Sequence, residues 1–301
     1  MGPSASGKTK LAIDLAVSFC GEIISADSRQ LYSRMDIATA KPSFEERGGI
    51  SHHLFDIKNP DEEYSVAEFA SEAASIIQEL SVKNKIPIVV GGTGLYFRIL
   101  LENFAPPKVA PNKELRDELE LKTTEELYKE LRDFDPVIAE KIHFNNKVKI
   151  IRALEVCKTL NKPMSEAQGV KESDYDVLWI GLNAQNRQFL YDRADLRVDK
   201  MMEDGLLEEF KSLFDDYGKL SIFDSTIGYQ ELLPYIENQC TLDDAVSQIK
   251  QNTRRYVKRQ LSWFRANKSI NWLYIDEQSN LDILDTAKNL VSKFLESGSN
   301  L

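Results

Sequence analysis

Short apolar runs alternate with amphipathic stretches along the first hundred residues of the chain. The spacing of apolar positions predicts helices over residues 10–19 and 66–80, and compact apolar runs predict strands over residues 22–26 and 86–90. Strands that alternate with helices at this spacing indicate βαβ units, which bury a parallel sheet between helices. We therefore expect the chain to begin as an α/β fold.

The pattern changes at residues 105–107, where an alanine is followed by two prolines. From residue 112 to about residue 159 the chain is charged and helical in pattern, without a convincing strand. Apolar runs at residues 177–182 and 272–275 predict a return to the sheet. We therefore predict a helical insertion domain in an α/β core, with the core at residues 1–105 and 171–301 and the insertion at residues 106–170.

The composition, 42 % hydrophobic and 29 % charged, is that of an ordinary soluble protein. No apolar run has the length of a membrane span and no charged-then-apolar leader opens the sequence, so we expect a cytoplasmic protein without a membrane segment. Cys20, Cys157 and Cys240 form no C-x-x-C pair and no zinc spacing with the histidines. We expect each cysteine to be a buried apolar residue.

The segment GPSASGKT at residues 2–9 matches the phosphate-loop pattern G-x-x-x-x-G-K-[ST]. Glycines let the backbone wrap a phosphate, while N–H groups of the loop and of the following helix point at the anion. Lys8 supplies a positive charge, and Thr9 supplies a hydroxyl for Mg²⁺. The fold class is therefore predicted to be P-loop NTPase-like, a parallel sheet flanked by helices. The expected phosphate-binding residues are Gly2, Ser4, Ala5, Ser6, Gly7, Lys8 and Thr9.

A phosphate loop normally follows a buried strand, but only Met1 precedes this one. We expect the native gene to encode about six to ten further residues, a typical strand length, that complete the sheet. The strand at residues 86–90 ends in Gly-Gly-Thr-Gly, without the aspartate that helps to hold Mg²⁺ in ordinary P-loop ATPases. The acidic residue at a strand end is instead Asp27, which would face the phosphate loop across the carboxyl edge of the sheet. Its expected role is general base or metal contact, and a helix-capping carboxylate is the alternative.

Taken together, these segments resemble the tRNA dimethylallyltransferases, also called tRNA isopentenyltransferases. The matching segments occur in order and span nearly the whole chain. They are GPSASGKT (2–9), SADSRQLY (25–32), MDIATAKP (35–42), HHLFDI (52–57), GGTGLYFRILL (91–101), RALEV (152–156), IGYQEL (227–232) and TRRYVKRQLSWFR (253–265). The chain departs from the pattern at Ala38, where many members have glycine, and at residues 224–226, where some have an arginine.

The resemblance implies transfer of a dimethylallyl group from dimethylallyl diphosphate to the N6 amine of the adenosine 3′-adjacent to the anticodon of tRNA. The phosphate loop would grip the diphosphate of this donor, which accounts for the missing ATPase aspartate. Lys8 and Thr9 would bind diphosphate and Mg²⁺, Asp27 would take the proton from the amine, and Arg197 would contact the leaving diphosphate. The residues that the resemblance places along the tRNA are Asp27, Ser28, Arg29, Gln30, Thr93, Arg116, Arg152 and Tyr229.

The net charge of −10 disfavours a general attraction to nucleic acid, so an RNA partner must meet a local basic surface. Residues 245–275 contain no Asp or Glu, but they contain Lys250, Arg254, Arg255, Lys258, Arg259, Arg265 and Lys268. On a helix with about 100° per residue, the cations from 250 to 265 fall on about half of the circumference. The other half carries Ile249, Tyr256, Val257, Trp263 and Phe264. We expect the apolar half to pack on the core and the basic half, with Arg254, Arg255, Lys258 and Arg259, to bind the anticodon stem-loop; a solvated face is the alternative.

Two groups of residues stay open between functional and structural roles. His52 and His53 are expected to be structural, whereas Tyr96 and Phe97 line either a prenyl pocket or the core. The rival functions are an adenylate isopentenyltransferase, which needs neither the basic helix nor the insertion, and an ATP-dependent P-loop kinase, in which GGTGLY would have no place. A non-catalytic RNA-binding protein would have no use for Lys8, Thr9 and Asp27. We expect a monomer.

Overall fold

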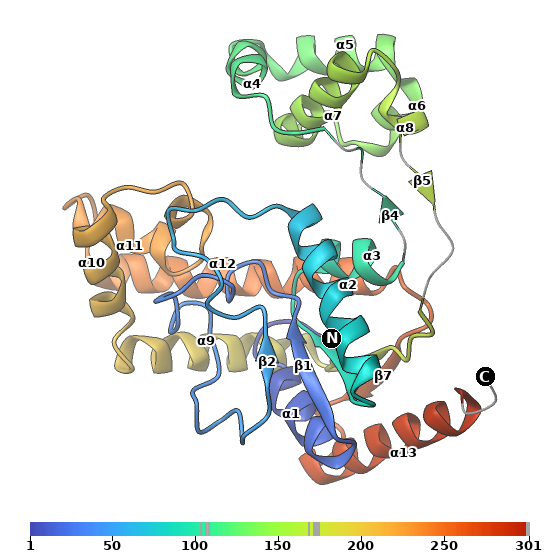
Figure 1. The fold of residues 1–301 in the computed structure, drawn as a ribbon. Helices are drawn as coiled ribbons and strands as arrows, with labels where there is room; N and C mark the ends of the chain where they lie inside the picture. The colour runs from blue at the N-terminus through green and yellow to red at the C-terminus, as the bar shows by residue number, and fades with distance from the viewer. Residues whose placement is uncertain (103, 106, 108, 168, 171–174, 299–301) are drawn as a thin grey trace. The chain divides into compact units, whose positions relative to one another are not determined.

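The computed structural model describes residues 1–102, 104–105, 107, 109–167, 169–170 and 175–298 (Figure 1). The chain divides into two compact units. One comprises Met1–Phe97 and Asp176–Leu301, and the other comprises Arg98–Tyr175. The first combines small parallel sheets with many helices, and the second is mainly helical. The predicted domain junctions at residues 106 and 171 lie outside the described residues.

In the first unit, β1 (Gly21–Ser25) lies between β2 (His52–His53) and β3 (Ile86–Val90), and both neighbours are parallel to it. Every residue of β1 is buried, as expected for a strand in a parallel sheet with both faces covered. Helices α1 (Lys8–Ser18) and α2 (Val66–Val82) pack on this sheet (Figure 1). The strands predicted at residues 22–26 and 86–90 and the two flanking helices are therefore confirmed.

A second parallel pair consists of β6 (Ile180–Asn183) and β7 (Asn271–Tyr274). The strand predicted at residues 177–182 begins three residues later than expected. Met1 lies along β6, because its amino group donates to the Ile180 carbonyl oxygen at 2.7 Å and its carbonyl accepts from the Leu182 N–H at 2.9 Å. The phosphate loop that follows Met1 is therefore anchored at the edge of β6. The expected upstream strand concerns residues outside this sequence and stays a prediction.

Further helices complete this unit. They are α3 (Gly94–Leu101), whose last residues belong to the other unit, α9 (Arg187–Glu203), α10 (Leu206–Tyr217), α11 (Tyr229–Ile236), α12 (Leu242–Phe264) and α13 (Asn280–Gly298), with a 3₁₀ turn at Phe223–Ser225. The largest described core cluster joins α9 to α12 around Phe210, which stacks on Tyr229 at 4.9 Å and meets Phe223 edge-on. Figure 1 shows α9 beside α12, where they pack together.

The second unit contains α4 (Lys113–Glu120), α5 (Thr124–Phe134), α6 (Pro136–Lys141), α7 (Lys147–Leu160) and α8 (Met164–Ala167). A two-residue antiparallel pair, β4 (Phe104–Ala105) with β5 (Gly169–Val170), lies outside the helical stretch. Leu127, Leu131, Leu154 and Cys157 belong to the core that the helices share. The helical pattern predicted for residues 112–159 is confirmed.

The prediction that all three cysteines are buried is wrong for Cys20. Cys157 is buried and Cys240 is partly buried, but Cys20 is exposed. It lies in the turn between α1 and β1 with φ at 52°, a conformation that directs the chain sharply into the sheet. Among the described residues, no helix is long and apolar enough to cross a bilayer.

Candidate phosphate-binding active site

The phosphate loop leads from Met1 directly into α1. Gly7 precedes the helix with φ at 88°, a left-handed conformation that favours glycine. A Cβ atom at Gly2 would come within 2.8 Å of the Ser6 hydroxyl oxygen and 2.9 Å of the Leu182 carbonyl oxygen, so only glycine fits there. No described side chain caps the N-terminus of α1. The N–H groups of its first turn and the positive end of the helix dipole therefore face the loop without a competing cap.

A cleft of about 810 Å³ opens beside this loop. Its lining includes Lys8 and Thr9 from the start of α1, Arg193 and Arg197 from α9, and Pro42 from the loop after β1. Arg193 also supports the phosphate loop itself, since its Nε donates to the Ala5 carbonyl oxygen at 2.9 Å. The cleft therefore collects cations from two helices that are far apart in the sequence.

The charged forms of Lys8 and Arg197 are disfavoured in the protein alone. Burial and repulsion from the Arg197 guanidinium lower the pKa of Lys8 to about 8, although attraction to Asp27 opposes both effects. Burial also lowers the pKa of Arg197 below its ordinary value. An anion in the cleft would oppose both effects, because it would replace lost hydration and attract both cations. The electrostatics around Lys8 and Arg197 therefore favour an anionic ligand.

Asp27 lies two residues after the end of β1, at the carboxyl edge of the sheet. The Arg29 N–H donates to Asp27 Oδ1 at 3.0 Å, and the Ser28 N–H donates to the Thr93 hydroxyl at 3.0 Å. The Thr93 N–H in turn donates to the Ala26 carbonyl oxygen at 3.1 Å. The loops that follow β1 and β3 are thus tied together around the carboxylate.

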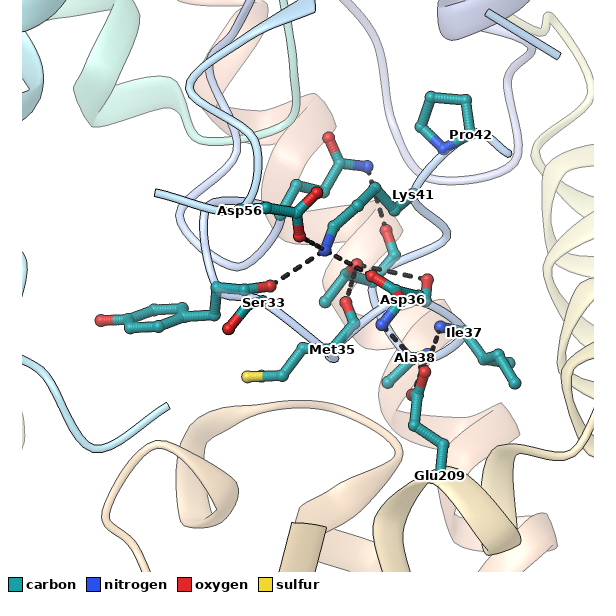
Figure 2. A network of polar contacts seen from close by, with 12 residues as sticks. Ser33, Met35, Asp36, Ile37, Ala38, Lys41, Pro42, Asp56 and Glu209 are labelled. Atoms are coloured by element: carbon teal, nitrogen blue, oxygen red, sulfur yellow. Dashed lines mark hydrogen bonds and ion pairs between the residues drawn. The ribbon is translucent and has the colours of Figure 1, made fainter. Parts of the chain in front are cut away.

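Glu209 of α10 holds the loop that forms one wall of the cleft (Figure 2). Its carboxylate accepts the backbone N–H groups of residues 36–38 at 2.7 to 3.0 Å, and it also accepts the Tyr229 hydroxyl at 2.7 Å. Three consecutive N–H groups that converge on one carboxylate fix the local backbone. Residue 209 was not identified from the sequence, because nothing in the chain order indicates that α10 approaches this loop.

Lys41 holds the same loop from within (Figure 2). Its side chain is only 3 % exposed, and its ammonium group bonds to Asp36 Oδ1 at 2.5 Å, to Asp56 Oδ1 at 2.6 Å and to the Tyr32 carbonyl oxygen at 2.9 Å. A lysine that satisfies all three of its donors in this way is a structural cross-link. It keeps Pro42 in place at the cleft. The family segment at residues 35–42 contains Lys41, but the sequence did not indicate the structural role of this lysine.

Ser28, Arg29, Gln30 and Thr93 lie together at the carboxyl edge of the sheet, as their sequence positions suggested. Arg29 reaches the Ser225 hydroxyl with one guanidinium nitrogen at 3.1 Å. The Gln30 amide instead donates to the carbonyl oxygens of Thr39 and Ala40 at 3.1 and 3.3 Å, which supports the cleft wall. Gln30 therefore stabilises the wall of the cleft even without RNA bound.

Tyr229 does not fit the expected contact with tRNA. Its side chain is 0 % exposed, its ring stacks on Phe210 in the core and its hydroxyl is committed to Glu209. Burial raises the pKa of Tyr229 far above its ordinary value, and the adjacent Glu209 adds to this effect. The aromatic ring packs the core here because α10 and α11 close over it, which the local motif could not indicate.

The helix predicted to carry the basic surface is α12. Arg255, Lys258 and Arg259 are exposed on it, as expected. Two other cations are neutralised by α9, since Arg254 pairs with Asp195 at 2.6 Å and Lys250 pairs with Asp199 at 2.5 Å. The positive face is therefore narrower than the sequence suggests.

Trp263 was expected on the buried half of this helix, but its side chain is 40 % exposed. Near the end of α12 the tryptophan lies over Gly94. An added Cβ at Gly94 would lie 2.0 Å from the Trp263 ring. Tyr96 and Phe97, in contrast, are core residues. Tyr96 stacks on Phe69 at 3.9 Å, and Phe97 meets Phe264 edge-on at 6.0 Å.

Arg116 and Arg152 belong to the second unit, where both grip one buried carboxylate. Glu155 is 0 % exposed and accepts Arg116 Nε and Nη2 at 2.8 and 2.9 Å, Arg152 Nη1 at 2.5 Å and the Asn112 N–H at 2.7 Å. Burial alone would raise the pKa of Glu155, but these bonds outweigh it and lower the pKa. Both arginines thus have a structural partner, in addition to the RNA contact that the sequence predicts.

Replacing Arg116 with methionine is expected to lower the free energy of unfolding of the chain by about 2–3 kcal/mol, because a buried carboxylate loses a two-pronged charged partner. Thermal denaturation without RNA measures the effect. The matched control is Arg132→Met, since Arg132 is exposed in the same unit. Equal stability of the two variants, with weaker RNA binding by the first alone, would assign Arg116 to RNA and contradict a structural role.

The family-model comparison decides the family. A model described as IPP transferase matches residues 30–267 of the chain. The chain belongs to the IPP transferase family. Curated relatives of this family include a tRNA dimethylallyltransferase of Caldanaerobacter subterraneus subsp. tengcongensis, 42 % identical over 94 % of this chain and 93 % of the relative. Another is a tRNA dimethylallyltransferase of Bacillus cereus, 45 % identical over 94 % of this chain and 92 % of the relative.

Solved structures in the IPP transferase family have the same fold. A full-length tRNA isopentenylpyrophosphate transferase of Bacillus halodurans aligns with a TM-score of 0.75 at 38 % identity, over 99 % of this chain and 96 % of that one. A eukaryotic dimethylallyltransferase, described as acting on tRNA, aligns with a TM-score of 0.84 at 31 % identity. That alignment covers 98 % of this chain and 78 % of the eukaryotic chain.

Proposed function

We propose that this member of the IPP transferase family transfers a dimethylallyl group from dimethylallyl diphosphate to the N6 amine of the adenosine 3′-adjacent to the anticodon of tRNA, releasing diphosphate. The observation that carries the proposal is the cleft lined by Lys8 and Thr9 of the phosphate loop and by Arg197 of α9, with Asp27 close enough to interact electrostatically with both cations. The names of the relatives point to the same reaction. We interpret the architecture as a P-loop NTPase-like core with a helical insertion domain.

The donor diphosphate would lie against the loop from Gly2 to Thr9. As the bond between its oxygen and the allylic carbon breaks, negative charge builds up on the diphosphate. Lys8, Arg197 and the N–H groups of the loop would stabilise this charge more strongly than that of the intact donor, which is the requirement for catalysis. The lowered pKa values of Lys8 and Arg197 support this role, because both cations gain a partner when the anion binds.

The residues of the cleft fit Mg²⁺ as a companion of the diphosphate. Among the described residues, no group of three or more His, Cys, Asp or Glu side chains forms a metal cage. Mg²⁺ does not need one, because it is commonly held by one or two protein oxygens together with phosphate and water. The Thr9 hydroxyl would hold the ion, and the buried Ser6 hydroxyl, which lacks a described hydrogen-bond partner, remains available to the diphosphate. The ion would neutralise charge on the leaving group.

Asp27 would serve as the general base. The exocyclic amine of adenine is a weak nucleophile, and its nitrogen becomes acidic as it bonds to the allylic carbon. Because Asp27 Oδ1 already accepts the Arg29 N–H, we assign the proton to Oδ2. The target adenine would leave its stack to reach this position. Ser28, Arg29, Gln30 and Thr93 would line its path.

The anticodon stem-loop would bind the exposed cations of α12, chiefly Arg255, Lys258 and Arg259, with Arg254 acting through its pair with Asp195. Contacts of this kind neutralise phosphates and make affinity dependent on salt. Arg116 and Arg152 would add contacts from the second unit. We propose that the protein acts as a monomer in the cytoplasm.

Incubation with Mg²⁺ and radiolabelled dimethylallyl diphosphate tests the function. Label is expected in unmodified tRNA, but not in AMP or in tRNA whose adenosine beside the anticodon has been replaced. Labelling of AMP would instead indicate an adenylate isopentenyltransferase. Turnover of ATP without any labelling would overturn the proposal in favour of a P-loop kinase.

A further inference from the structure

One buried side chain of α12 contacts the loops on both sides of the proposed site. Gln260 is 4 % exposed. Its Oε1 accepts the Ser4 N–H at 2.8 Å and the Ser4 hydroxyl at 3.3 Å, and its Nε2 donates to the Gly92 carbonyl oxygen at 3.1 Å. Ser4 belongs to the phosphate loop and Gly92 to the loop after β3. A single amide therefore connects two loops that are 88 residues apart in the sequence, from a third element.

The chemistry of the partners allows only one orientation of this amide. The Ser4 N–H is a donor and must face the amide oxygen, while the Gly92 carbonyl is an acceptor and must face the amide nitrogen. A flipped amide would place donor against donor and acceptor against acceptor. Glutamate would keep only the first bond, and methionine would keep neither. The site therefore selects glutamine by its polarity as well as its length.

The packing of α12 against the same loop is close. A Cβ atom added at Gly92 would lie 2.2 Å from Gln260 Nε2, and one added at Gly94 would lie 2.0 Å from the Trp263 ring. Both glycines are thus explained by side chains one turn apart on α12. Between them, Thr93 binds the Ser28 N–H beside Asp27. A small shift of α12 would therefore move the phosphate loop and the loop that holds Thr93 beside Asp27 at the same time.

The opposite face of α12 carries the exposed cations Arg255, Lys258 and Arg259. We propose that Gln260 is a positioning residue that couples the binding of tRNA on this face to the geometry of the phosphate loop. This inference rests on the proposed function, because it assumes tRNA on α12 and diphosphate in the cleft. Binding of tRNA would hold α12 in place, and Gln260 would in turn hold Ser4 in the conformation that accepts the diphosphate. The two ligands would then bind more tightly together than separately.

The decisive measurement is the affinity for diphosphate, titrated with Mg²⁺ in the absence and in the presence of saturating tRNA that lacks the target adenosine. In the unaltered protein, tRNA is expected to raise the affinity by about fivefold or more, a typical coupling between two sites. Gln260→Met is expected to reduce this factor to about one. Its kcat for transfer is expected to fall by about 10- to 100-fold, since a misplaced loop costs rate. Its KM for tRNA should stay near the unaltered value.

The variant Gln260→Glu distinguishes the contribution of the bond to Ser4 from that of the bond to Gly92. It retains the acceptor for Ser4 but sets a carboxylate against the Gly92 carbonyl oxygen, so transfer relative to the unaltered protein is expected to recover as the pH falls and the carboxyl group becomes a donor. Lys258→Met serves as the binding control. It should weaken tRNA binding. At saturating tRNA it should retain the coupling factor, which is the ratio of the diphosphate affinities with and without tRNA. This variant pattern would not follow from a general loss of stability.

Equal coupling factors in the unaltered protein and in Gln260→Met, whether large or close to one, would overturn the inference. Failure of the proposed function is recognised separately, because the unaltered protein would then transfer no label to tRNA. If Gln260→Met does not fold, Gln260→Glu carries the same comparison, and a coupling factor equal to that of the unaltered protein at neutral pH would count against the inference.

Discussion

Replacing Asp27 with asparagine is expected to lower kcat for dimethylallyl transfer by about 10²- to 10⁴-fold, the range typical for loss of a general base. Asparagine retains an oxygen that can accept the Arg29 N–H, so the loop after β1 should keep its conformation. The amide cannot take a proton from the adenine amine. Single-turnover transfer of label to tRNA, measured with saturating donor, isolates the chemical step.

The control for this prediction is Asp61→Asn, which removes an exposed carboxylate outside the cleft. Its kcat should equal that of the unaltered protein. The melting temperature should be nearly the same for all three proteins. A kcat for Asp27→Asn within about threefold of that of the unaltered protein would contradict the assignment, because the loss of a general base lowers kcat far more.

The affinity for the donor is expected to fall with rising pH because of Lys8. Its pKa is about 8 in the protein alone, so Lys8 is mostly protonated at pH 7 and mostly neutral at pH 9. Diphosphate binds the protonated form and raises this pKa. The KM for dimethylallyl diphosphate should therefore be constant below about pH 7 and rise by up to about tenfold per pH unit above pH 8, until Lys8 also titrates in the complex.

Lys8→Met should remove this pH dependence and lower kcat/KM for the donor by about 10²- to 10³-fold, as does the loss of one preorganised group that stabilises a developing anion. Steady-state kinetics from pH 6.5 to about pH 9.5 at constant ionic strength test both effects. Lys83→Met is the matched control, because Lys83 is exposed and pairs at the surface with Glu79 at 3.9 Å. A pH profile of Lys8→Met that matches the unaltered protein would assign the titration to another group.

Much of the local structure follows from the order of residues alone. The apolar run of β1, the capping box of Ser65 with Glu68 at the start of α2, and the long α12 are short-range features, and each was within reach of pattern analysis. The phosphate-loop motif likewise specifies its own conformation, since Gly7 allows the left-handed turn and α1 follows directly. The family could be inferred from segments of this kind, because each is a contiguous motif.

Roles that depend on distant partners could not be inferred. The resemblance places Arg116, Arg152 and Tyr229 along the tRNA. In the structure both arginines bond to the buried Glu155, and Tyr229 is itself buried. The same limit hid Glu209 and the link that Gln260 makes to Ser4.

The sequence by itself therefore determined many of the elements, the phosphate-loop motif and the family, because local propensity and contiguous motifs encode them. Only the tertiary structure decided which charges stay exposed and which are paired within the protein. It also decided which side chains hold the cleft and that the helix with the proposed tRNA surface reaches the phosphate loop. The physical reason is that these outcomes depend on burial and on partners far apart in the chain, and spacing along a sequence does not report either.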